Sequence, residues 1–571
     1  MHPQLELWFI MERDGTRWNT FFLRAPCGTR VERILISCYD SKMNMKEFNV
    51  TGLCVPGKHY MVDISGKLAK IMDMIGKGQY FTINRARQYG KTTTLFLLAR
   101  ALPKEYTCIS LSFEGLGDES FATSAAFCAA FMELVRRALQ FAQVDDEYSN
   151  AWFDPEVDDF ISLDRHITKM CKPDVAGFGK KLVLMIDEVD KTSGNLVFLH
   201  FLGMLRSKFL ANQAGAAGTF HSVILAGVYD IRNIKLKMIN EGAYTPTAME
   251  NKIYNSPWNI AADFKVDMSF NPDEISTMLA EYDADHNTGM DVAALANEIY
   301  GFTSGYPFLV SRICQHIDEE LGKDWTLAGV QDAVKIMLTE NNTLFDDVFK
   351  NLENVRELHD FIYSLLINGE ARRYIIHDPI IAAGVRHGFF RNKDGRVAVS
   401  NRIFELLMAD YFISKDLRDK KQVNGVLQRD IVNSGRFNME QCLLKFAEHF
   451  AEIYNNDDIE FLEKHGRLIF LSYLTPLING GGFYHIESQL TDLRRMDLVV
   501  DYGRDQFIIE LKIWRGEQHE KEAYEQLCGY LSRKRSDIGY LLTFDFRKPG
   551  NRATKAQWVE IDGKRIFDVV V

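Results

Sequence analysis

The sequence has few of the features that mark secreted, membrane-bound or disulfide-stabilised proteins. Its nine cysteines are scattered, and no two of them form a C-x-x-C pair. Because their number is odd and their spacing irregular, they indicate neither a disulfide framework nor a zinc site, and we expect buried free thiols. No apolar run reaches the ~18 residues of a membrane span, and the N-terminus lacks a basic region followed by an apolar one. We therefore expect a cytoplasmic protein without membrane contact.

Glycine and proline are not enriched, and the chain has no net positive charge. Only 39 glycines and 13 prolines occur among 571 residues, and the chain has no internal repeat or low-complexity tract. With 46% hydrophobic and 25% charged residues, the composition is that of a folded globular protein. The formal net charge of −11 means that any contact with nucleic acid must use a local basic patch. None of the 14 histidines stands out as a ligand or catalytic group.

The length predicts three or four domains at about 150 residues each. The order of strand-like, helical and polar segments divides the chain further. We expect an appendage of unknown role at 1–44, an α/β core at 45–265, a helical region at 266–345, a winged-helix-like module at 346–415, a linker at 416–436 and a strand-rich domain at 437–571. Met45 lies directly before the α/β core, so the appendage could also reflect the choice of start codon.

The α/β core is predicted from apolar runs of strand length that alternate with helical segments. Strands are expected at 79–84, 106–113, 182–186 and 221–228, and a helix at 93–102. The run LVLMI at 182–186 is continuously apolar, as in a parallel strand covered on both faces. Alternation of this kind predicts a parallel sheet.

A phosphate-binding turn is predicted between the first strand and the following helix. The segment RARQYGKT at 85–92 follows the strand and opens the helix. Amides at such a helix start can cradle phosphate oxygens, which Lys91 neutralises, while the Thr92 hydroxyl binds magnesium. Arg85 stands where a glycine is usual in this motif. We expect nucleotide contacts from Arg85, Gln88, Tyr89, Gly90, Lys91, Thr92, Thr93 and Asp187.

Two acidic residues complete this predicted site. LVLMIDEVD places Asp187 and Glu188 at the end of an apolar strand. An acid there can hold magnesium together with Thr92, and the next acid can polarise an attacking water, so Glu188 is a candidate catalytic residue or else a salt-bridge partner. Asp230 and Arg232, after the strand at 221–228, are either γ-phosphate sensors or a polar strand end. No arginine finger is assigned.

A second site is predicted near the C-terminus, in the run RRMDLVVDYGRDQFIIELK at 494–512. A hairpin turning between Gly503 and Arg504 would place Asp497 opposite Glu510, with Lys512 on the same face. Two facing carboxylates favour a cation between them, so Asp497 and Glu510 are candidate metal ligands and Lys512 a candidate catalytic residue. The alternative is a lysine–carboxylate cluster on a solvated sheet. Other side chains of interest are Glu463, Glu487, Gln526 and Tyr530.

The first set of motifs resembles the AAA-ATPase-like family of bacterial and archaeal proteins. The residues that carry the resemblance are FNVTGLCVPGKHYMVDISGKLAKI, YFTINRARQYGKTTTL and LVLMIDEVD. SGYPFLVSRICQ at 304–315 resembles the lid helix of signalling ATPases with numerous domains, and 384–408 is similar to their winged-helix module. The resemblance implies a P-loop parallel-sheet ATPase core with a helical lid at 266–345 and a winged-helix-like module.

The C-terminal region resembles the PD-(D/E)XK nuclease superfamily, which is often fused to such ATPases. The similarity lies in FLEKHGRLIFLSYLTPLINGGGFYHIESQ, RRMDLVVDYG, FIIELKIWRGE and YEQLCGYL. The motif formed by Asp497 and by Glu510-x-Lys512 matches without substitution. The resemblance implies a restriction-endonuclease-like α/β domain.

Two functional hypotheses follow from these motifs. In the first, the chain binds and hydrolyses ATP with Mg²⁺ and thereby regulates a fused nuclease that acts on DNA or RNA with Mg²⁺ or Mn²⁺. In the second, the chain is a signalling or scaffold ATPase whose C-terminal domain binds nucleic acid or a partner without cleaving it. Both hypotheses leave homo-oligomerisation open.

Overall fold

The structure is a computed structural model of the 571-residue chain. It describes β1 (Arg13–Asp14), β2 (Arg17–Trp18) and residues 46–571, except 173–178, 190–194, 229–257, 368–369, 420–430, 434–435, 454–458, 479–480, 489–495, 515 and 546–554. Within helices and strands, the side chains of 13–14, 17–18, 416–419, 433, 451–453, 459–465, 485–488, 496–497 and 517 are not described.

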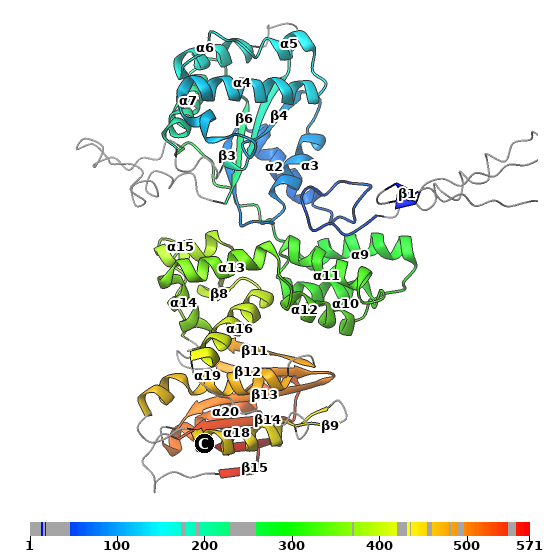
Figure 1. Ribbon diagram of the computed structural model, residues 1–571, viewed down its shortest axis with the longest axis vertical. Helices are drawn as coiled ribbons and strands as arrows, with labels where there is room; N and C mark the ends of the chain where they lie inside the picture. Colours follow the sequence, from blue (N-terminus) through cyan, green and yellow to red (C-terminus); the bar gives the residue numbers. More distant parts are fainter. Residues whose placement is uncertain are drawn as a thin grey trace, which may run out of the picture.

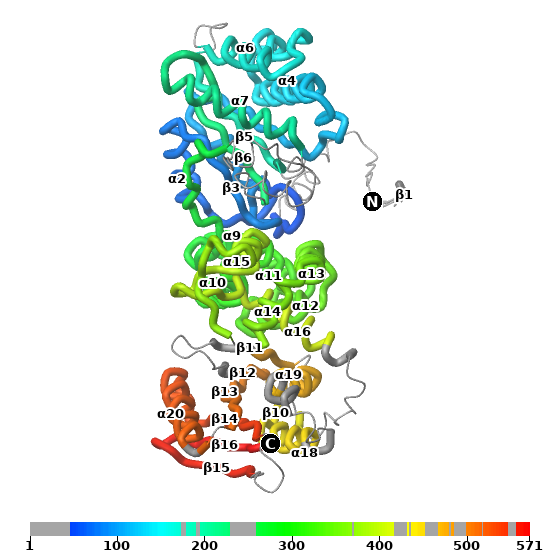
Figure 2. Tube along the Cα trace, turned by 90° about the vertical axis from the view of Figure 1, so that its left-hand side faces the viewer, coloured from blue at the N-terminus to red at the C-terminus, as the bar shows by residue number. Residues whose placement is uncertain are grey.

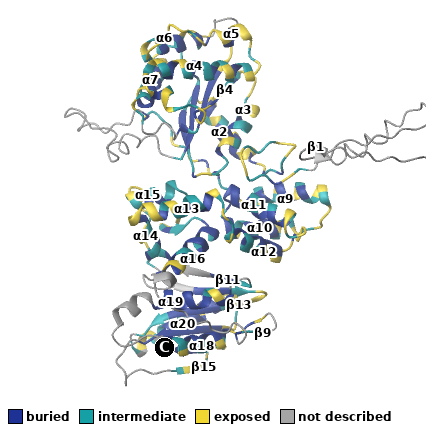
Figure 3. Cartoon of the chain, in the orientation of Figure 1, coloured by how far each residue is buried: buried dark blue, intermediate teal, exposed yellow. Residues whose placement is uncertain are grey.

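The described chain forms an elongated molecule of three tiers (Figure 1). An α/β tier carries the N-terminal half, a helical tier lies in the middle, and a second sheet forms the C-terminal tier. The view turned by 90° shows the same order (Figure 2). The central strands of both large sheets are among the most buried parts of the molecule (Figure 3).

The first tier is built on a four-stranded parallel sheet in the order β3-β6-β5-β4. Its strands are β3 (Tyr80–Asn84), β4 (Tyr106–Ser112), β5 (Lys181–Asp187) and β6 (Ser222–Gly227). Its helices are α2 (Ser65–Gly76), α3 (Lys91–Ala101), η1 (Asp118–Phe121), α4 (Ser124–Phe141), α5 (Asp146–Asn150), α6 (Phe160–Met170) and α7 (Leu196–Gln213). The expected strands and the helix after the first of them are therefore confirmed.

Both faces of this sheet are covered by helices. Val183 packs in one core cluster with Ile71 of α2, while the next residue, Leu184, packs in another with Phe127 of α4. Successive side chains of a strand point to opposite faces, so a strand buried on both faces is apolar throughout. This explains the unbroken apolar run in β5. On the outer side of β3, the amide of Ala262 donates to the carbonyl of Tyr80 at 2.8 Å.

The middle tier is helical apart from one hairpin. Its elements are α9 (Pro272–His286), α10 (Val292–Thr303), α11 (Pro307–Glu319), α12 (Leu327–Leu338), α13 (Thr343–Asn354), α14 (Arg356–Leu366), α15 (Pro379–Arg386), β7 (Phe390–Lys393), β8 (Arg396–Val399) and α16 (Arg402–Asp419). β7 and β8 pair antiparallel around Asp394 and Gly395, both with positive φ. The two strands form a β-hairpin that lies within the region 346–415.

The C-terminal tier contains a six-stranded mixed sheet in the order β11-β12-β13-β14-β16-β15. Its elements are α18 (Met439–Ile453), α19 (Ile459–Ile478), β11 (Gly482–Ser488), β12 (Met496–Tyr502), β13 (Asp505–Ile513), α20 (Glu517–Lys534), β14 (Ile538–Phe544), β15 (Lys555–Ile561) and β16 (Lys564–Val570). β13 and β14 are parallel and joined through α20. Figure 2 shows α20 on one side of the strands and α18 and α19 on the other.

Some elements cross the limits that the sequence suggested. α13 begins at Thr343, inside the region expected to end at 345, and α16 runs to Asp419, into the expected linker. The linker also contains β9 (Val432–Asn433), paired with β10 (Arg436–Phe437). Polar residues at the end of α16 resemble a linker in composition, but a helix can be polar where one face is solvated. Among the described residues, no helix combines the length and the apolar character needed to cross a bilayer.

Candidate functional site

The turn between β3 and α3 has the backbone of an anion-binding loop. Gly90 is the N-cap of α3 with a φ of 73°, and no side chain caps the helix. Gln88 also has a positive φ, 54°, which is uncommon for a residue with a side chain. A helix start without a side-chain cap leaves backbone N–H groups and the positive end of the helix dipole for an anion.

Lys91 lies under this loop and is 7% exposed. Its ammonium donates to the carbonyls of Arg85 and Ala86, at 3.1 and 2.9 Å. A buried ammonium is costly unless it is hydrogen-bonded, and these carbonyls supply partners. The positive charge is therefore held directly beside the helix start.

Thr92 and Asp187 are in direct contact, although β3, which precedes Thr92 in the chain, and β5, which ends at Asp187, are not neighbours in the sheet. β6 separates β3 from β5, yet the Thr92 hydroxyl donates to Oδ2 of Asp187 at 2.6 Å. The other oxygen, Oδ1, accepts from the backbone N–H of Glu188 at 2.9 Å. A hydroxyl and a carboxylate at this separation are oxygen donors of the kind that Mg²⁺ prefers. The two side chains therefore fit a shared magnesium ion.

Glu188 follows Asp187 in a strained backbone conformation. Its φ is 54°, and its side chain is half-buried. Strain of this kind costs of order 1–3 kcal/mol and concentrates at functional sites. The geometry places Glu188 beside the phosphate-binding turn but leaves its catalytic role a prediction.

Arg85 does not join the other predicted nucleotide contacts. Its backbone N–H donates to the carbonyl of Gly227 at 3.1 Å, so it belongs to the sheet rather than to the loop. Its guanidinium donates to the carbonyl of Val266 at 2.7 Å and lies 5.5 Å from the ring centroid of Phe264. Burial lowers the pKa of Arg85. The side chain therefore fastens β3 to the segment beside it. Asp230 and Arg232 lie outside the described residues.

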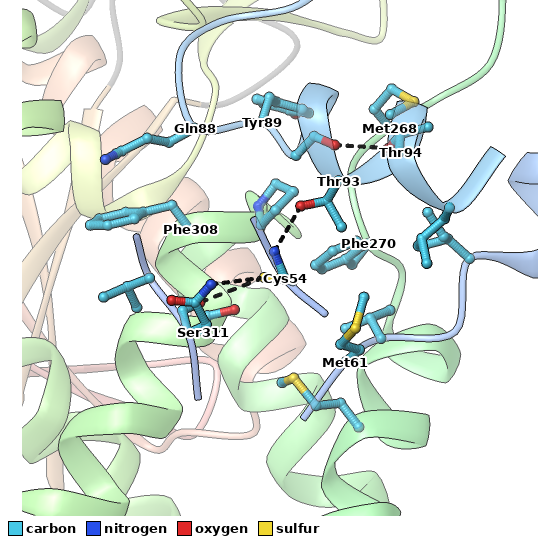
Figure 4. Close-up of a pocket in the computed structure, with 18 of the residues that line it drawn as sticks. Cys54, Met61, Gln88, Tyr89, Thr93, Thr94, Met268, Phe270, Phe308 and Ser311 are labelled. Carbon is cyan, nitrogen blue, oxygen red and sulfur yellow. Dashed lines mark hydrogen bonds between the residues drawn. The ribbon is translucent and has the colours of Figure 1, made fainter. Parts of the chain in front are cut away.

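A cavity of about 300 Å³ adjoins the loop, and Gln88, Tyr89 and Gly90 are among the residues that line it. Its walls come from four segments, within 49–67, 88–97, 268–278 and 307–311. Figure 4 shows Thr93 and Thr94 of α3 around the same space as Met61, Phe270 and Phe308. The backbone N–H of Cys54 donates to the Thr93 hydroxyl at 3.3 Å and so ties the first segment to α3. A mostly apolar cavity next to the predicted phosphate-binding turn suits an aromatic base.

Sequence reasoning missed the residues that line this cavity. They include Val50, Met61, Leu97, Met268, Phe270 and Phe308. Each is an ordinary apolar residue in its own segment, and no spacing rule connects segments more than 200 residues apart. Tyr89 and Thr93, which were predicted as nucleotide contacts, do line the cavity. Burial raises the pKa of Tyr89, so its ring is neutral.

The loop also contacts the middle tier. The hydroxyl of Tyr306, just before α11, donates to the carbonyl of Arg87, and its ring lies 4.6 Å from that of Tyr89. Arg87 pairs with Asp347 of α13 at 3.1 Å. Gln88 donates to the hydroxyl of Thr343 at 3.3 Å. The phosphate-binding turn is thus held by α13 and by the start of α11.

The predicted C-terminal hairpin is present in the expected register. β12 and β13 pair with Asp497 opposite Glu510, and Leu498 and Ile509 face α18 and α19. Glu510 is 1% exposed and forms an ion pair with Lys512. The register of Asp497 opposite Glu510 and the shared face of Glu510 and Lys512 were predicted correctly.

The surroundings of Glu510 are partly polar. The Lys512 ammonium also donates to Oε1 of Gln526 on α20 at 3.2 Å. Glu487 of β11 pairs in register with Asp497, but the side chains of Glu463, Glu487 and Asp497 are not described. In the part of the chain with described side chains, no three acidic, histidine or cysteine residues cluster as a metal site would require. The metal site at Asp497 and Glu510 therefore stays a prediction.

Comparison with known proteins finds a match for the part of the chain that contains the first of these two sites. A family model described as an AAA-like domain matches residues 60–327. A Walker-type ATPase of Pyrococcus abyssi is 11% identical, with 63% of this chain and 99% of that chain covered and a TM-score of 0.43. The ORC2 protein of Aeropyrum pernix in ADPNP–ADP complexes is 11% identical, with 62% of this chain and 93% of that chain covered and a TM-score of 0.31.

The ADP form of the same ORC2 protein is 13% identical, with 65% of this chain and 97% of that chain covered and a TM-score of 0.32. No curated protein matches the sequence. The TM-scores are too low for these solved structures to support an argument about this chain. The match of the family model ends at residue 327, before the C-terminal tier begins. The N-terminal part of the chain is therefore similar to an AAA-like domain over residues 60–327.

Proposed function

We propose that the chain binds ATP at the start of α3, with its base in the adjoining cavity and its phosphates on residues 86–92. The contact that carries the proposal is the 2.6 Å hydrogen bond between Thr92 and Asp187, beside the buried Lys91. Magnesium, when bound, would neutralise the negative charge of the phosphates. Thr92 and Asp187 would hold that ion, and Lys91 would exchange loop carbonyls for phosphate oxygens.

ATP hydrolysis is the activity that we infer for this site. Glu188 is the candidate that orients the attacking water, since it directly follows Asp187 in a strained conformation. Its replacement by glutamine keeps the size and removes the charge. We therefore expect Glu188→Gln to bind ATP and to hydrolyse it at least about 100-fold more slowly.

Titration calorimetry with MgATP tests the binding proposal. Lys91→Ala and Thr92→Val should each weaken binding strongly, whereas Thr92→Ser keeps the hydroxyl and should bind almost as the wild type does. Lys70→Ala is a matched control, because Lys70 is an exposed lysine on α2 outside the cavity wall. Wild-type affinity in both Lys91→Ala and Thr92→Val would sink the assignment.

For the C-terminal tier, we propose metal-dependent cleavage of nucleic acid under control of the ATPase. The support is a buried carboxylate, Glu510, beside Lys512 and in register with Asp497. Magnesium or manganese, when bound, would stabilise charge on a phosphodiester and activate water. Lys512 is positioned to hold or orient that water, while Gln526 fixes the ammonium.

Cleavage assays separate this proposal from its alternative. Plasmid DNA, single-stranded DNA and RNA would be incubated with Mg²⁺ or Mn²⁺, with and without ATP. We expect cleavage by the wild type and by Lys521→Ala, an exposed lysine of α20, and none by Lys512→Ala or Asp497→Ala. Cleavage that does not respond to Lys91→Ala would remove regulation by ATP from the proposal.

The alternative is a signalling or scaffold ATPase without nuclease activity. It draws support from the contacts of the phosphate loop with Tyr306, Thr343 and Asp347 of the middle tier. Such contacts would convert a change of nucleotide into a rearrangement of helices. Absence of cleavage by the wild type under every condition, with ATP binding intact, would favour this alternative.

A further inference from the structure

A buried histidine in the middle tier lies between two carboxylates. His316 belongs to α11 and is 1% exposed. Its Nδ1 lies 2.8 Å from Oε1 of Glu320, one turn further along the chain. Its Nε2 lies 2.7 Å from Oε1 of Glu340, which comes just after α12. Both ring nitrogens therefore face a carboxylate oxygen, and an ionised carboxylate can only accept hydrogen bonds.

Close contacts of this kind at both nitrogens require a doubly protonated ring. A neutral imidazole has one N–H group, so one of its nitrogens would present a lone pair to a carboxylate. The imidazolium ion has two N–H groups and a positive charge, and it satisfies both carboxylates at once. α10 and α12 pack against α11 but add no further ion pair to the ring within the described residues. The geometry is therefore that of a protonated histidine.

Arg312 completes the charge balance of this cluster. Its Nε donates to Oε1 and Oε2 of Glu340 at 2.9 and 3.2 Å. While His316 is protonated, two cations face the two carboxylates of Glu320 and Glu340. Without that proton a single cation remains, and the side chain of Glu340 is only 13% exposed. Unbalanced charge at such a buried position is costly, so loss of the proton must rearrange the cluster.

The contact with Glu340 is the one that deprotonation breaks. Nδ1 of His316 and Oε1 of Glu320 meet in the geometry of a hydrogen bond. Nε2 is close to Glu340 but has no partner in hydrogen-bond geometry, so this second contact depends on charge. A neutral ring would therefore keep its N–H group on Nδ1 and turn a lone pair toward Glu340. The carboxylate of Glu340 would then be repelled from α11.

Glu340 lies directly before α13, which contacts the turn between β3 and α3. Asn342 is the N-cap of α13, and its side-chain amide donates to Oε2 of Glu340 at 3.4 Å. The next residue, Thr343, accepts the hydrogen bond from Gln88 of that turn at 3.3 Å. A displacement of Glu340 therefore acts on the first residues of α13, and these residues hold the turn.

We propose that protonation of His316 controls how firmly α13 holds the turn between β3 and α3. Histidine is the side chain whose charge ordinarily changes between pH 5 and 8. The ion pairs with Glu320 and Glu340 form only while the ring is protonated. They therefore stabilise the start of α13 at low pH and are lost as pH rises. The turn is thus held more firmly in a mildly acidic environment than in a mildly alkaline one.

Hydrogen exchange measured by mass spectrometry on the full chain tests the proposal. The protection of amides in 339–347, relative to an unstructured peptide at the same pH, should fall at least about tenfold in the wild type between pH 6 and pH 8. His316→Gln stays polar but carries no charge, so its protection should be the same at both pH values. His200→Gln is the matched control and should behave as the wild type does. His200 is exposed on α7 and forms no ion pair within the described residues.

Glu320→Gln provides a second variant in case His316→Gln does not fold. Glu320 is exposed at the end of α11, so its replacement leaves the core unchanged. It removes one carboxylate that favours the imidazolium, and the loss of protection should therefore occur at lower pH than in the wild type. The proposal is overturned if wild-type protection of 339–347 does not depend on pH. It is also overturned if either variant shows the same pH dependence as the wild type.

ATP affinity gives a further readout, which rests on the function proposed above. Calorimetry with MgATP should show at least about fivefold tighter binding at pH 6 than at pH 8 in the wild type, beyond any change in His316→Gln. The comparison between the two proteins cancels the protonation of ATP itself. Absence of ATP binding at both pH values would refute the proposed function and leave the exchange result standing. Equal pH dependence of affinity in both proteins would overturn the coupling of His316 to the turn.

Discussion

Replacing Gly305 by alanine should damage the cavity beside α3 without touching it directly. Gly305 lies between α10 and α11 with a φ of 73°, and its carbonyl accepts the backbone N–H of Phe270 at 2.8 Å. A Cβ at this position would lie 1.8 Å from the carbonyl oxygen of Phe270. The segment that contains Phe270 must therefore move by more than an ångström, and Phe270 lines the cavity.

The cost of the substitution has three parts. Alanine in the left-handed region costs about 1 kcal/mol, loss of the hydrogen bond to Phe270 about 1 kcal/mol, and overpacking about 1–3 kcal/mol. We expect a total loss of about 3–5 kcal/mol in the free energy of unfolding of the middle tier. Displacement of Phe270 should also weaken ATP binding by at least about tenfold, because the apolar wall no longer closes.

Gly301 provides the matched control for this experiment. It lies inside α10, four residues before Gly305, and a Cβ there meets nothing within 4 Å. Alanine in a helix interior is better than glycine by about 0.5–1 kcal/mol, so Gly301→Ala should stabilise the protein. Urea unfolding and ATP calorimetry would be measured on both variants. Wild-type stability and affinity in Gly305→Ala, or equal losses in both variants, would refute the reasoning.

Two further predictions concern contacts between tiers. Burial raises the pKa of Asp410, which accepts from the Tyr484 hydroxyl at 3.4 Å across the α16–β11 contact, to about 6. Between the two pKa values the folded state holds a proton that the unfolded state releases, so the free energy of unfolding should fall by about 2 kcal/mol as pH rises from 4 to 6, and by only a few tenths more above pH 6. Asp410→Asn should abolish this pH dependence in urea titrations, and an unchanged slope would contradict it. Tyr306→Phe removes the hydroxyl that donates to the carbonyl of Arg87. Loss of this hydrogen bond should weaken nucleotide binding by about 1 kcal/mol, so a fluorescent nucleotide should dissociate about fivefold faster in stopped flow. An unchanged release rate would show that this contact does not hold the loop.

Local features of the fold could be predicted because they depend on residues close in sequence. The strand before Arg85, the turn at Gly90 and the helix after it follow from apolar runs and a glycine at the right place. The register of Asp497 opposite Glu510 follows from counting back from a two-residue turn. In each case the determining residues lie within about one element of each other, where propensity and periodicity act.

The cavity could not be predicted, because no local pattern determines it. Met61, Met268 and Phe308 meet only after three segments have packed against α3. Arg85 illustrates the same limit in a single side chain. Its position in the motif suggested phosphate, but tertiary packing offers it the carbonyl of Val266 and the ring of Phe264 instead. An arginine takes whichever acceptor the fold brings near, and sequence spacing does not reveal it.

The phosphate loop is packed too tightly against the middle tier to change independently of it. A Cβ added at Gly388, just before β7, would lie 2.8 Å from Cβ of Ala86 within the loop. There is thus no room for even a methyl group between the loop and Gly388. Close-packed contacts of this kind transmit displacement instead of absorbing it.

A second continuous contact leads from the cavity to the C-terminal sheet. Phe308 lines the cavity at the start of α11, and Phe302 ends α10 just before the same turn. The guanidinium of Arg402 lies 5.2 Å from the ring of Phe302 and pairs with Asp501 of β12 at 3.5 Å. The ring of Phe483 on β11 lies 6.0 Å from that of Phe302. If a nucleotide repositions the turn between α10 and α11, these contacts must either move with it or break, and we propose that this is how the C-terminal tier would respond to the nucleotide.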